Sequence, residues 1–186
     1  MTLQLTRKHN FDVVFDSQKI FRLILEAMSN PTRVVNIKEY GDDSVFLAVA
    51  MTLLDNEVSF NTCGNETLSE EISSLTLAKR ENIENADFIF TNDVKYIENF
   101  KCGTLADPHK SATVIIRNDG DPACQLTFYG PGINGLTTVQ VTQIVHDAII
   151  LRDAQNYEYP QGIDLIFVSG AGELFAIPRL TRMEVQ

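Results

Sequence analysis

The feature that most constrains the fold is a pair of apolar runs near the end of the chain. They cover residues 163–168 and 173–177, and Gly170-Ala171-Gly172 lies between them. Two such runs joined by a glycine turn predict a β-hairpin. The first run is nearly continuous in large apolar residues, which predicts a central strand covered on both faces. Asp164 interrupts it, and a carboxylate there has to be hydrogen-bonded, paired or close to the strand's end.

Helical and strand patterns alternate in the residues before this hairpin. A cap at Asp16-Ser17 predicts a helix to Ser29, which Pro31 ends. Further helices are predicted over residues 45–54, 65–80, 94–100 and 142–154, and strands over 33–40, 57–62, 86–91, 112–117, 124–129 and 136–141. The turn signal at 118–122 predicts that the strands on either side of it pair antiparallel. Residues 41–43 predict a turn before a helix capped by Asp43 or Ser44.

This order of elements predicts an α/β fold with a mixed sheet and helices on both of its faces. The chain has 186 residues and shows no internal repeat or linker, so a single domain over residues 1–186 is expected. Such a chain can bury about 70 % of the surface that its unfolded form exposes. Residues 1–10 are polar and are expected to be mobile.

The net charge of -10 argues against nucleic acid or an anionic membrane as a main partner, because both bind clustered Lys and Arg. The longest apolar run, residues 45–54, has about half the length that a bilayer span needs, and no signal peptide is evident. A soluble, cytoplasmic protein is therefore expected. Cys63, Cys102 and Cys124 show no C-x-x-C spacing, so reduced thiols are expected.

A literal G-x-G-x-x-G motif occurs at residues 130–135, after a predicted strand. In a dinucleotide site these glycines lead into a helix whose amino end faces the pyrophosphate. Here the following residues, 136–141, have the pattern of a strand, so turn glycines are favoured over a nucleotide site.

His109 is the histidine best placed for chemistry, because it shares a loop with Asp107, Lys110 and Cys102. It could act as a general acid or base, although a solvated loop histidine is the more common case. His146 has no second ligand at helical spacing, and neither a metal site nor a catalytic residue is predicted. No signature of a nucleophile elbow or a phosphate-binding lysine loop is present.

Three arginines are candidates for an anion site or a subunit contact: Arg22, Arg179 and Arg182. Arginine grips phosphate and phosphonate groups with a bidentate fork. The alternative, which we favour, places Arg22 on the solvent face of its helix and the two tail arginines in surface or subunit contacts.

Several segments together resemble the H subunit of the bacterial carbon-phosphorus lyase system, the PhnH family. They are Phe21-Arg22, Ala27-Met28-Ser29-Asn30-Pro31, Gly103-Thr104, Ser111-Ala112-Thr113, Gly130-Pro131-Gly132-Ile133, Tyr159-Pro160-Gln161-Gly162-Ile163-Asp164-Leu165-Ile166 and Ile177-Pro178-Arg179. The resemblance covers nearly the whole chain, and its last block is the most specific. Thr32 stands where glycine is usual, and Leu180 stands where the family has threonine.

The resemblance implies a three-layer α/β/α domain related to the pyridoxal-phosphate transferase fold, without that cofactor. It implies assembly with the G, I and J subunits, self-association as a homodimer, and no cofactor bound by this chain. The complex is associated with forming a ribose 1-phosphonate 5-triphosphate from MgATP and an alkylphosphonate, and the iron-sulfur J subunit cleaves the C–P bond. The family supplies no catalytic residue for the H subunit.

The sequence is compatible with three functions. The leading one is an accessory subunit of a phosphonate-degrading complex, in which Asp164 and Arg179 hold the strand end and the tail in place. The others are a stand-alone enzyme with a pocket around His109 and Arg179, and a nucleotide-binding module that uses the glycine segment. The subunit interface is expected on the apolar helix 45–54 or on an edge strand.

Overall fold

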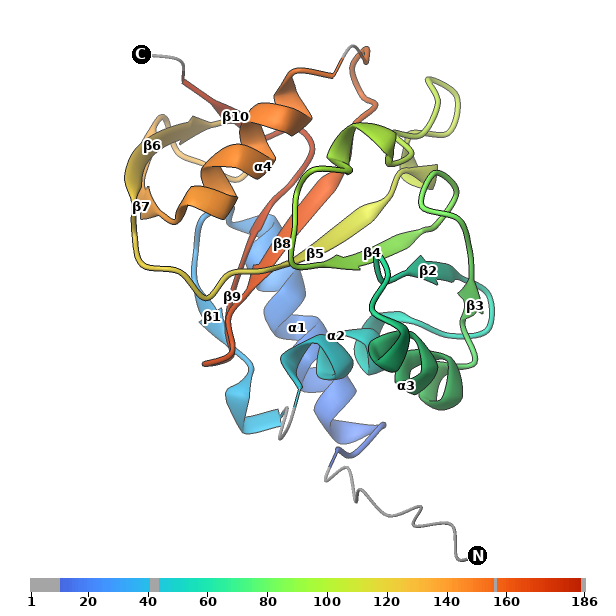
Figure 1. Cartoon of the computed structure of the whole chain (residues 1–186). Helices are drawn as coiled ribbons and strands as arrows, with labels where there is room; N and C mark the ends of the chain where they lie inside the picture. Colours follow the sequence, from blue (N-terminus) through green and yellow to red (C-terminus); the bar gives the residue numbers. More distant parts are fainter. Residues whose placement is uncertain (1–10, 41–43, 156, 185–186) are drawn as a thin grey trace, which may run out of the picture.

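Seven strands form one mixed sheet in the order β1-β9-β8-β5-β4-β2-β3 (Figure 1). This computed structural model of the chain describes residues 11–40, 44–155 and 157–184. The strands from β8 to β3 run parallel, and β9 and β1 are antiparallel to their neighbours. Their bounds are β1 Val35–Asn36, β2 Ser59–Asn61, β3 Lys79–Arg80, β4 Phe88–Thr91, β5 Thr113–Arg117, β8 Asp164–Val168 and β9 Glu173–Ile177.

A second, three-stranded sheet has the order β10-β6-β7 and is antiparallel throughout. Its strands are β6 Cys124–Tyr129, β7 Thr137–Val141 and β10 Arg182–Met183. The α-helices are α1 Phe15–Ser29, α2 Val45–Leu53, α3 Glu66–Thr76 and α4 Gln143–Asp153, and the 3-10 helices are η1 Lys38–Tyr40, η2 Ile97–Asn99 and η3 Pro108–Lys110.

Both faces of the large sheet are buried, because successive residues of β8 enter two different apolar clusters. Ile166 and Val168 pack with α1, α2 and α3, whereas Leu165 and Phe167 pack with α4 and the small sheet. Figure 1 shows the same division, with α1 to α3 on one side of the sheet and α4 beside β6 and β7. The predicted α/β fold with a mixed sheet is thus confirmed, as is the hairpin of β8 and β9.

The predicted pairing of the strands around residues 118–122 is wrong. β5 has β4 and β8 as neighbours, both parallel to it, so neither of its edges is left for β6. β6 instead pairs with β7 and β10. Its burial alternates between inward Leu126 and Phe128 and more exposed neighbours, which suits a sheet packed on one face.

Three predicted elements are shorter than expected, and local hydrogen bonds explain each case. The strand over 33–40 ends at Asn36, whose side chain accepts the Lys38 N–H at 2.9 Å and turns the chain. The helix over 94–100 is reduced to η2, with backbone bonds of the i to i+3 type. The helix over 65–80 ends at Thr76, because Leu77 takes a left-handed conformation with φ 61°.

The first helix begins earlier than the predicted cap. Asp12 Oδ1 accepts the N–H groups of Val14 and Phe15 at 2.9 Å each, so α1 starts at Phe15. The predicted mobile start at residues 1–10 and the predicted turn at 41–43 lie outside the described residues. In the described ranges, no helix is long and apolar enough to cross a membrane.

Candidate functional site

Four of the seven segments that carry the family resemblance meet around a cavity of about 330 Å³, here named the tail pocket. The end of α1, the loop between β6 and β7, the start of β8 and the residues after β9 contribute its walls. The lining residues are Met28, Ser29, Pro131, Gly132, Asp164, Pro178, Arg179, Leu180 and Thr181. Segments separated by more than half of the chain thus build one site.

Asp164 and Arg179 form a bidentate pair on one wall of the tail pocket. Asp164 Oδ2 accepts from Arg179 Nη2 at 2.5 Å and from Nε at 3.2 Å, and Oδ1 accepts the Arg179 N–H at 2.8 Å. The carboxylate and guanidinium side chains are only 10 % and 19 % exposed. Arg179 Nη1 donates to the Pro108 carbonyl oxygen. A partly buried pair with this many charge-assisted bonds fixes the tail against the start of β8.

The predicted constraint on Asp164 is met in two ways at once. Asp164 is the first residue of β8, so it lies at the end of the strand, and its side chain is paired. Because Arg179 already donates through Nε, Nη1 and Nη2 to Asp164 and Pro108, its fork is not directed at an open anion site.

Gly132 brings the β6–β7 loop into contact with the end of α1. Its φ is +82°, and a Cβ there would lie 2.5 Å from the Ser29 carbonyl oxygen and 2.7 Å from Pro31 Cδ. Only glycine fits such a conformation and such an approach. The G-x-G-x-x-G segment is therefore a turn that leads into β7, as predicted, and no helix follows it.

Thr181 supplies an unpartnered hydroxyl to the tail pocket. The residue is 1 % exposed, and its Oγ1 has no hydrogen-bond partner in the described part of the chain. Its backbone is well bound, because the N–H donates to Pro178 O at 2.9 Å and the carbonyl accepts from Arg152 Nη2 at 2.7 Å. The hydroxyl is thus held in place next to the cavity.

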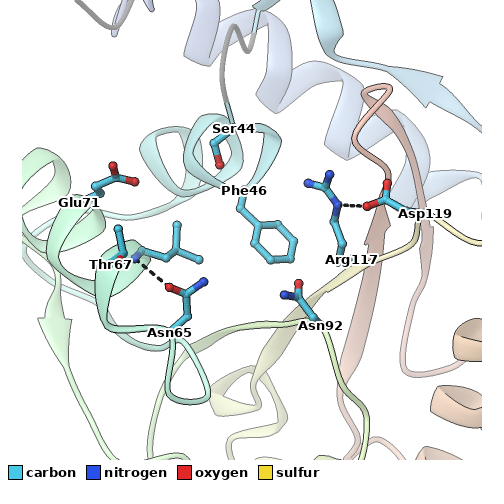
Figure 2. Close-up of a pocket in the computed structure, with 9 residues that line it drawn as sticks. Ser44, Phe46, Asn65, Thr67, Glu71, Asn92, Arg117 and Asp119 are labelled. Atoms are coloured by element: carbon cyan, nitrogen blue, oxygen red, sulfur yellow. Dashed lines mark hydrogen bonds and ion pairs between the residues drawn. The ribbon is translucent and has the colours of Figure 1, made fainter. Parts of the chain in front are cut away.

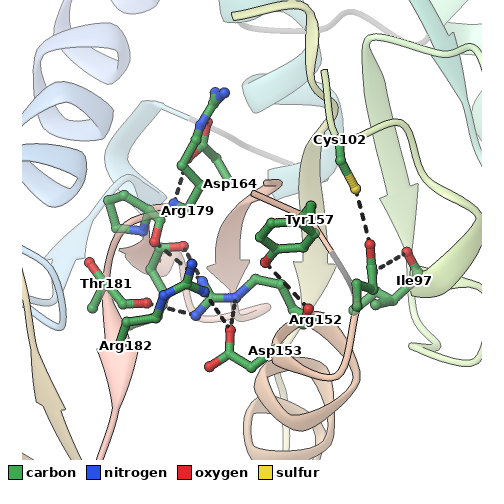
Figure 3. A network of polar contacts seen from close by, with 12 residues as sticks. Ile97, Cys102, Arg152, Asp153, Tyr157, Asp164, Arg179, Thr181 and Arg182 are labelled. Carbon is green, nitrogen blue, oxygen red and sulfur yellow. Dashed lines mark hydrogen bonds and ion pairs between the residues drawn. The ribbon is translucent and has the colours of Figure 1, made fainter. Parts of the chain in front are cut away.

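Arg152 is the residue that organises the tail, and the sequence reasoning did not single it out. It lies on α4, is fully buried, and donates to the carbonyl oxygens of Ile177, Pro178 and Thr181 at 3.3, 3.2 and 2.7 Å (Figure 3). Its Nε donates to Asp153 Oδ1 at 2.9 Å. Its position was detectable, because Val145, Ala148, Ile149 and Arg152 share the buried face of α4 at helical spacing.

Arg182 belongs to the same network. Its Nη1 lies 3.1 Å from Asp153 Oδ1, and its guanidinium carbon lies 5.8 Å from the centre of the Tyr157 ring. The Tyr157 hydroxyl in turn donates to the Arg152 carbonyl at 3.3 Å. Arg182 is therefore a structural contact between the tail and α4 (Figure 3).

His109 and Arg22 do not join this network through their side chains. His109 is exposed on η3, next to the Pro108 carbonyl that Arg179 binds. In the same loop the hydrogen bond from Lys110, 2.9 Å away, holds the pKa of Asp107 below its usual range. Arg22 is exposed on α1. Of the five candidate residues, the structure brings Asp164 and Arg179 into direct contact.

The three cysteines are unpaired, as predicted. Cys102 Sγ donates to Gln155 Oε1 at 3.0 Å, and burial raises the pKa of the Cys102 thiol. Burial is also the main cause that raises the pKa of Cys63. Neither thiol is therefore an activated nucleophile. Within the described ranges, no group of three or more His, Cys, Asp and Glu side chains could hold a metal ion.

Comparison with known proteins gives the family. The model of the family described as "Bacterial phosphonate metabolism protein (PhnH)" matches residues 9–184. A relative named "Putative C-P lyase subunit protein HtxG", from Stutzerimonas stutzeri, is 31 % identical over 174 residues, which cover 91 % of this chain and 86 % of the relative. The chain belongs to the PhnH family of bacterial phosphonate metabolism proteins.

Proposed function

We propose that this chain is an accessory subunit of a carbon-phosphorus lyase complex, and that it contributes shape and contact surface instead of reacting side chains. The observation that supports this proposal is that the buried charged side chains are already hydrogen-bonded within the chain. The side chains of Asp164, Arg179 and Arg152 form their hydrogen bonds with groups of this chain. These bonds hold the tail and the start of β8 in place. A catalytic acid, base or anion clamp needs a group that remains available to a substrate.

The finer assignment rests on the family. We infer that the chain assembles with the G, I and J subunits, forms a homodimer when alone, and works in the cytoplasm. In that complex it would support formation of ribose 1-phosphonate 5-triphosphate from MgATP and an alkylphosphonate, and would bind no cofactor itself. The relation to the pyridoxal-phosphate transferase fold, with its three α/β/α layers, stays a prediction of the resemblance. The sheet covered on both faces supports it.

The contact surface that we propose lies on α1. Helix 45–54 was one of the two expected interfaces, beside an edge strand, but residues 45–50 of this helix, α2, are buried in the core. On α1, by contrast, Phe15, Phe21 and Leu25 are 66 %, 45 % and 48 % exposed. Phe21 and Leu25 share a helix face because they are four residues apart, and neighbouring exposed apolar side chains are typical of surfaces that another subunit covers.

Co-expression with the G, I and J subunits tests this function. We expect the chain to co-purify with them in a stable complex, and we expect Phe21→Glu with Leu25→Glu to reduce recovery at least several-fold. Leu136→Glu is the matched control, because Leu136 is 60 % exposed but lies just before β7. A chain that never co-purifies would show that the subunit assignment is wrong.

The two other functions have less support. A stand-alone enzyme around His109 and Arg179 would need the Arg179 fork, which Asp164 and Pro108 occupy. A nucleotide module built on the glycine segment would need a helix after Gly135, and β7 stands there instead. An activity of the isolated chain on MgATP and a phosphonate, abolished by His109→Ala, would reverse this ranking.

A further inference from the structure

A second cavity, of about 500 Å³, lies at the carboxyl ends of β2, β4 and β5 (Figure 2). It is here named the strand-end pocket. None of the segments that carry the family resemblance lines it. The lining residues are Ser44, Phe46, Asn65, Thr67, Leu68, Glu71, Asn92, Arg117 and Asp119. Its volume is in the range of small-molecule sites.

The chain topology places this cavity where α/β sheets bind ligands. Ligands in open parallel sheets lie outside the carboxyl ends of the strands, where consecutive connections leave toward opposite faces. After β2 the chain enters α3, which packs against α2 on one face, and after β4 it enters η2, which packs against α4 on the other. The switch point therefore falls between β2 and β4, at the strand-end pocket.

The guanidinium of Arg117 is held in a fixed position at one side of the pocket. Its Nε donates to the Asp119 carboxylate, and its central carbon lies 6.0 Å from the centre of the Phe46 ring. Gly170 donates its N–H to Asp119 Oδ1 at 2.5 Å, and a side chain at Gly170 would collide with Arg117 Nη2. Only glycine leaves room for the guanidinium here.

In this arrangement the two Nη groups of Arg117 are available to bind a ligand. Neither Nη atom of Arg117 donates to another residue in the described ranges, although the side chain is only 32 % exposed. Partial burial acts to raise the pKa of Asp119, but the bonds from Arg117 and Gly170 outweigh it and hold that pKa below its usual range. The carboxylate is thereby committed to positioning Arg117, and the two Nη groups can bind an oxyanion.

The opposite side of the strand-end pocket offers an acceptor. Figure 2 shows Glu71, on α3, across the cavity from Arg117 and Asp119. Thr67, on the same side as Glu71, and Asn92, on the side of Arg117, add hydrogen-bonding side chains to the pocket wall. The first turns of α2 and α3 also begin here, capped by Ser44 and Asn65, and their remaining N–H groups favour negative charge.

We propose that the strand-end pocket binds a small molecule that carries a phosphoryl or phosphonyl oxyanion at one end and an ammonium or hydroxyl group at the other. The oxyanion is bound by the Arg117 fork and the helix ends, and the donor group by Glu71. This site goes beyond the accessory role proposed above. Co-purification with the other subunits and ligand binding by this chain are separate measurements, so either can fail alone.

Three probes separate the two ends of the ligand, and the full chain is titrated with each by calorimetry. 2-Aminoethylphosphonate carries both groups, ethylphosphonate lacks the ammonium, and ethanolamine lacks the oxyanion. We expect 2-aminoethylphosphonate to bind most tightly. Arg117→Gln should weaken binding of both phosphonates about tenfold or more. Glu71→Gln should weaken 2-aminoethylphosphonate alone, to the affinity of ethylphosphonate.

Arg33→Gln is the matched control, because Arg33 is an exposed arginine that pairs with Glu26 at 2.8 Å and does not line this pocket. It should leave all three affinities unchanged. If thermal unfolding shows that Arg117→Gln has lost its fold, Arg117→Lys replaces it; lysine keeps the charge without the fork, and the same tenfold loss is expected. The proposal is overturned if the unaltered chain binds no probe at about 10 mM, or if the Arg117 variants bind phosphonates as the Arg33 variant does.

Discussion

Arg152 on α4 donates through Nη2 to the carbonyl oxygen of Thr181 at 2.7 Å, so a fully buried guanidinium fixes the chain after β9. The same group also binds the carbonyls of Ile177 and Pro178. Three carbonyl groups within five residues of the tail thus depend on one side chain that belongs to another element. Thr181 also lines the tail pocket, so this hydrogen bond positions part of the pocket wall.

Arg152→Met should destabilise the fold strongly. Methionine fills much of the volume but leaves three carbonyl oxygens without the Arg152 donor, and each buried unsatisfied group costs about 1–3 kcal/mol. We expect the free energy of unfolding to fall by about 3–5 kcal/mol. Urea unfolding followed by circular dichroism measures it. The control Arg33→Met, at an exposed position, should change it by less than about 0.5 kcal/mol. Equal effects of the two substitutions would contradict the role given to Arg152.

Asp164→Ala should impair folding or assembly before it impairs any chemical step. The substitution leaves Arg179 partly buried and without its main partner, which costs about 3 kcal/mol when one member of such a pair is removed. Double-mutant analysis with Arg179→Met, by chemical unfolding, should give a coupling free energy of about 1–3 kcal/mol. A variant that is fully folded and assembled, yet inactive, would instead assign Asp164 to catalysis.

Acid should weaken the fold in part through Asp87. Burial acts to raise its pKa, but the bonds from Lys101 and from the Ser59 side chain and N–H outweigh burial, and the folded-state pKa lies below its usual value. A depressed pKa contributes stability that is complete above the unfolded value, about 3.9, and is lost as pH falls through the folded value.

Asp87→Asn should therefore lower stability at neutral pH and flatten the loss of stability below about pH 4. Thermal unfolding between about pH 3 and pH 7 measures both effects. Asp55→Asn is the control, since Asp55 is an exposed aspartate whose Oδ1 accepts the Glu57 N–H of its own turn at 2.9 Å. Parallel pH profiles for the Asp87 variant and the unaltered chain would disprove this assignment.

The sequence predicts well where one pattern determines the outcome. The nearly continuous run of β8 predicts a central strand, and the structure has it. The position of Asp164 within the run predicts a carboxylate that is hydrogen-bonded, paired or close to the strand's end, and in the structure it is paired and begins the strand. The pairing of β6 was not predictable from its turn, because β5 has both edges filled by strands distant in the sequence. A local turn pattern carries no information on which distant strands will pair with the edges of β5.

The candidate site, too, could be predicted from the sequence only in part. Asp164 and Arg179 could be named from the sequence, but their use of each other's hydrogen-bonding capacity could not. Arg152 was missed because an arginine at a helix end normally reaches solvent, and only its place on an apolar stripe hinted at burial. Arg117 ends a buried strand without any motif, and its fixed position depends on Asp119 and the distant Gly170.

Gly132→Ala and Gly135→Ala separate backbone strain from collision in the loop before β7. Both glycines have positive φ, +82° and +76°, so alanine should cost about 1 kcal/mol at either position. At Gly135 nothing lies within 4 Å of the added Cβ, whereas at Gly132 the Cβ would lie 2.5 Å from the Ser29 carbonyl oxygen. Overpacking of this kind costs about 1–3 kcal/mol more. Urea unfolding should therefore show a clearly larger loss for Gly132→Ala, and equal losses would mean that the loop does not depend on its contact with the end of α1.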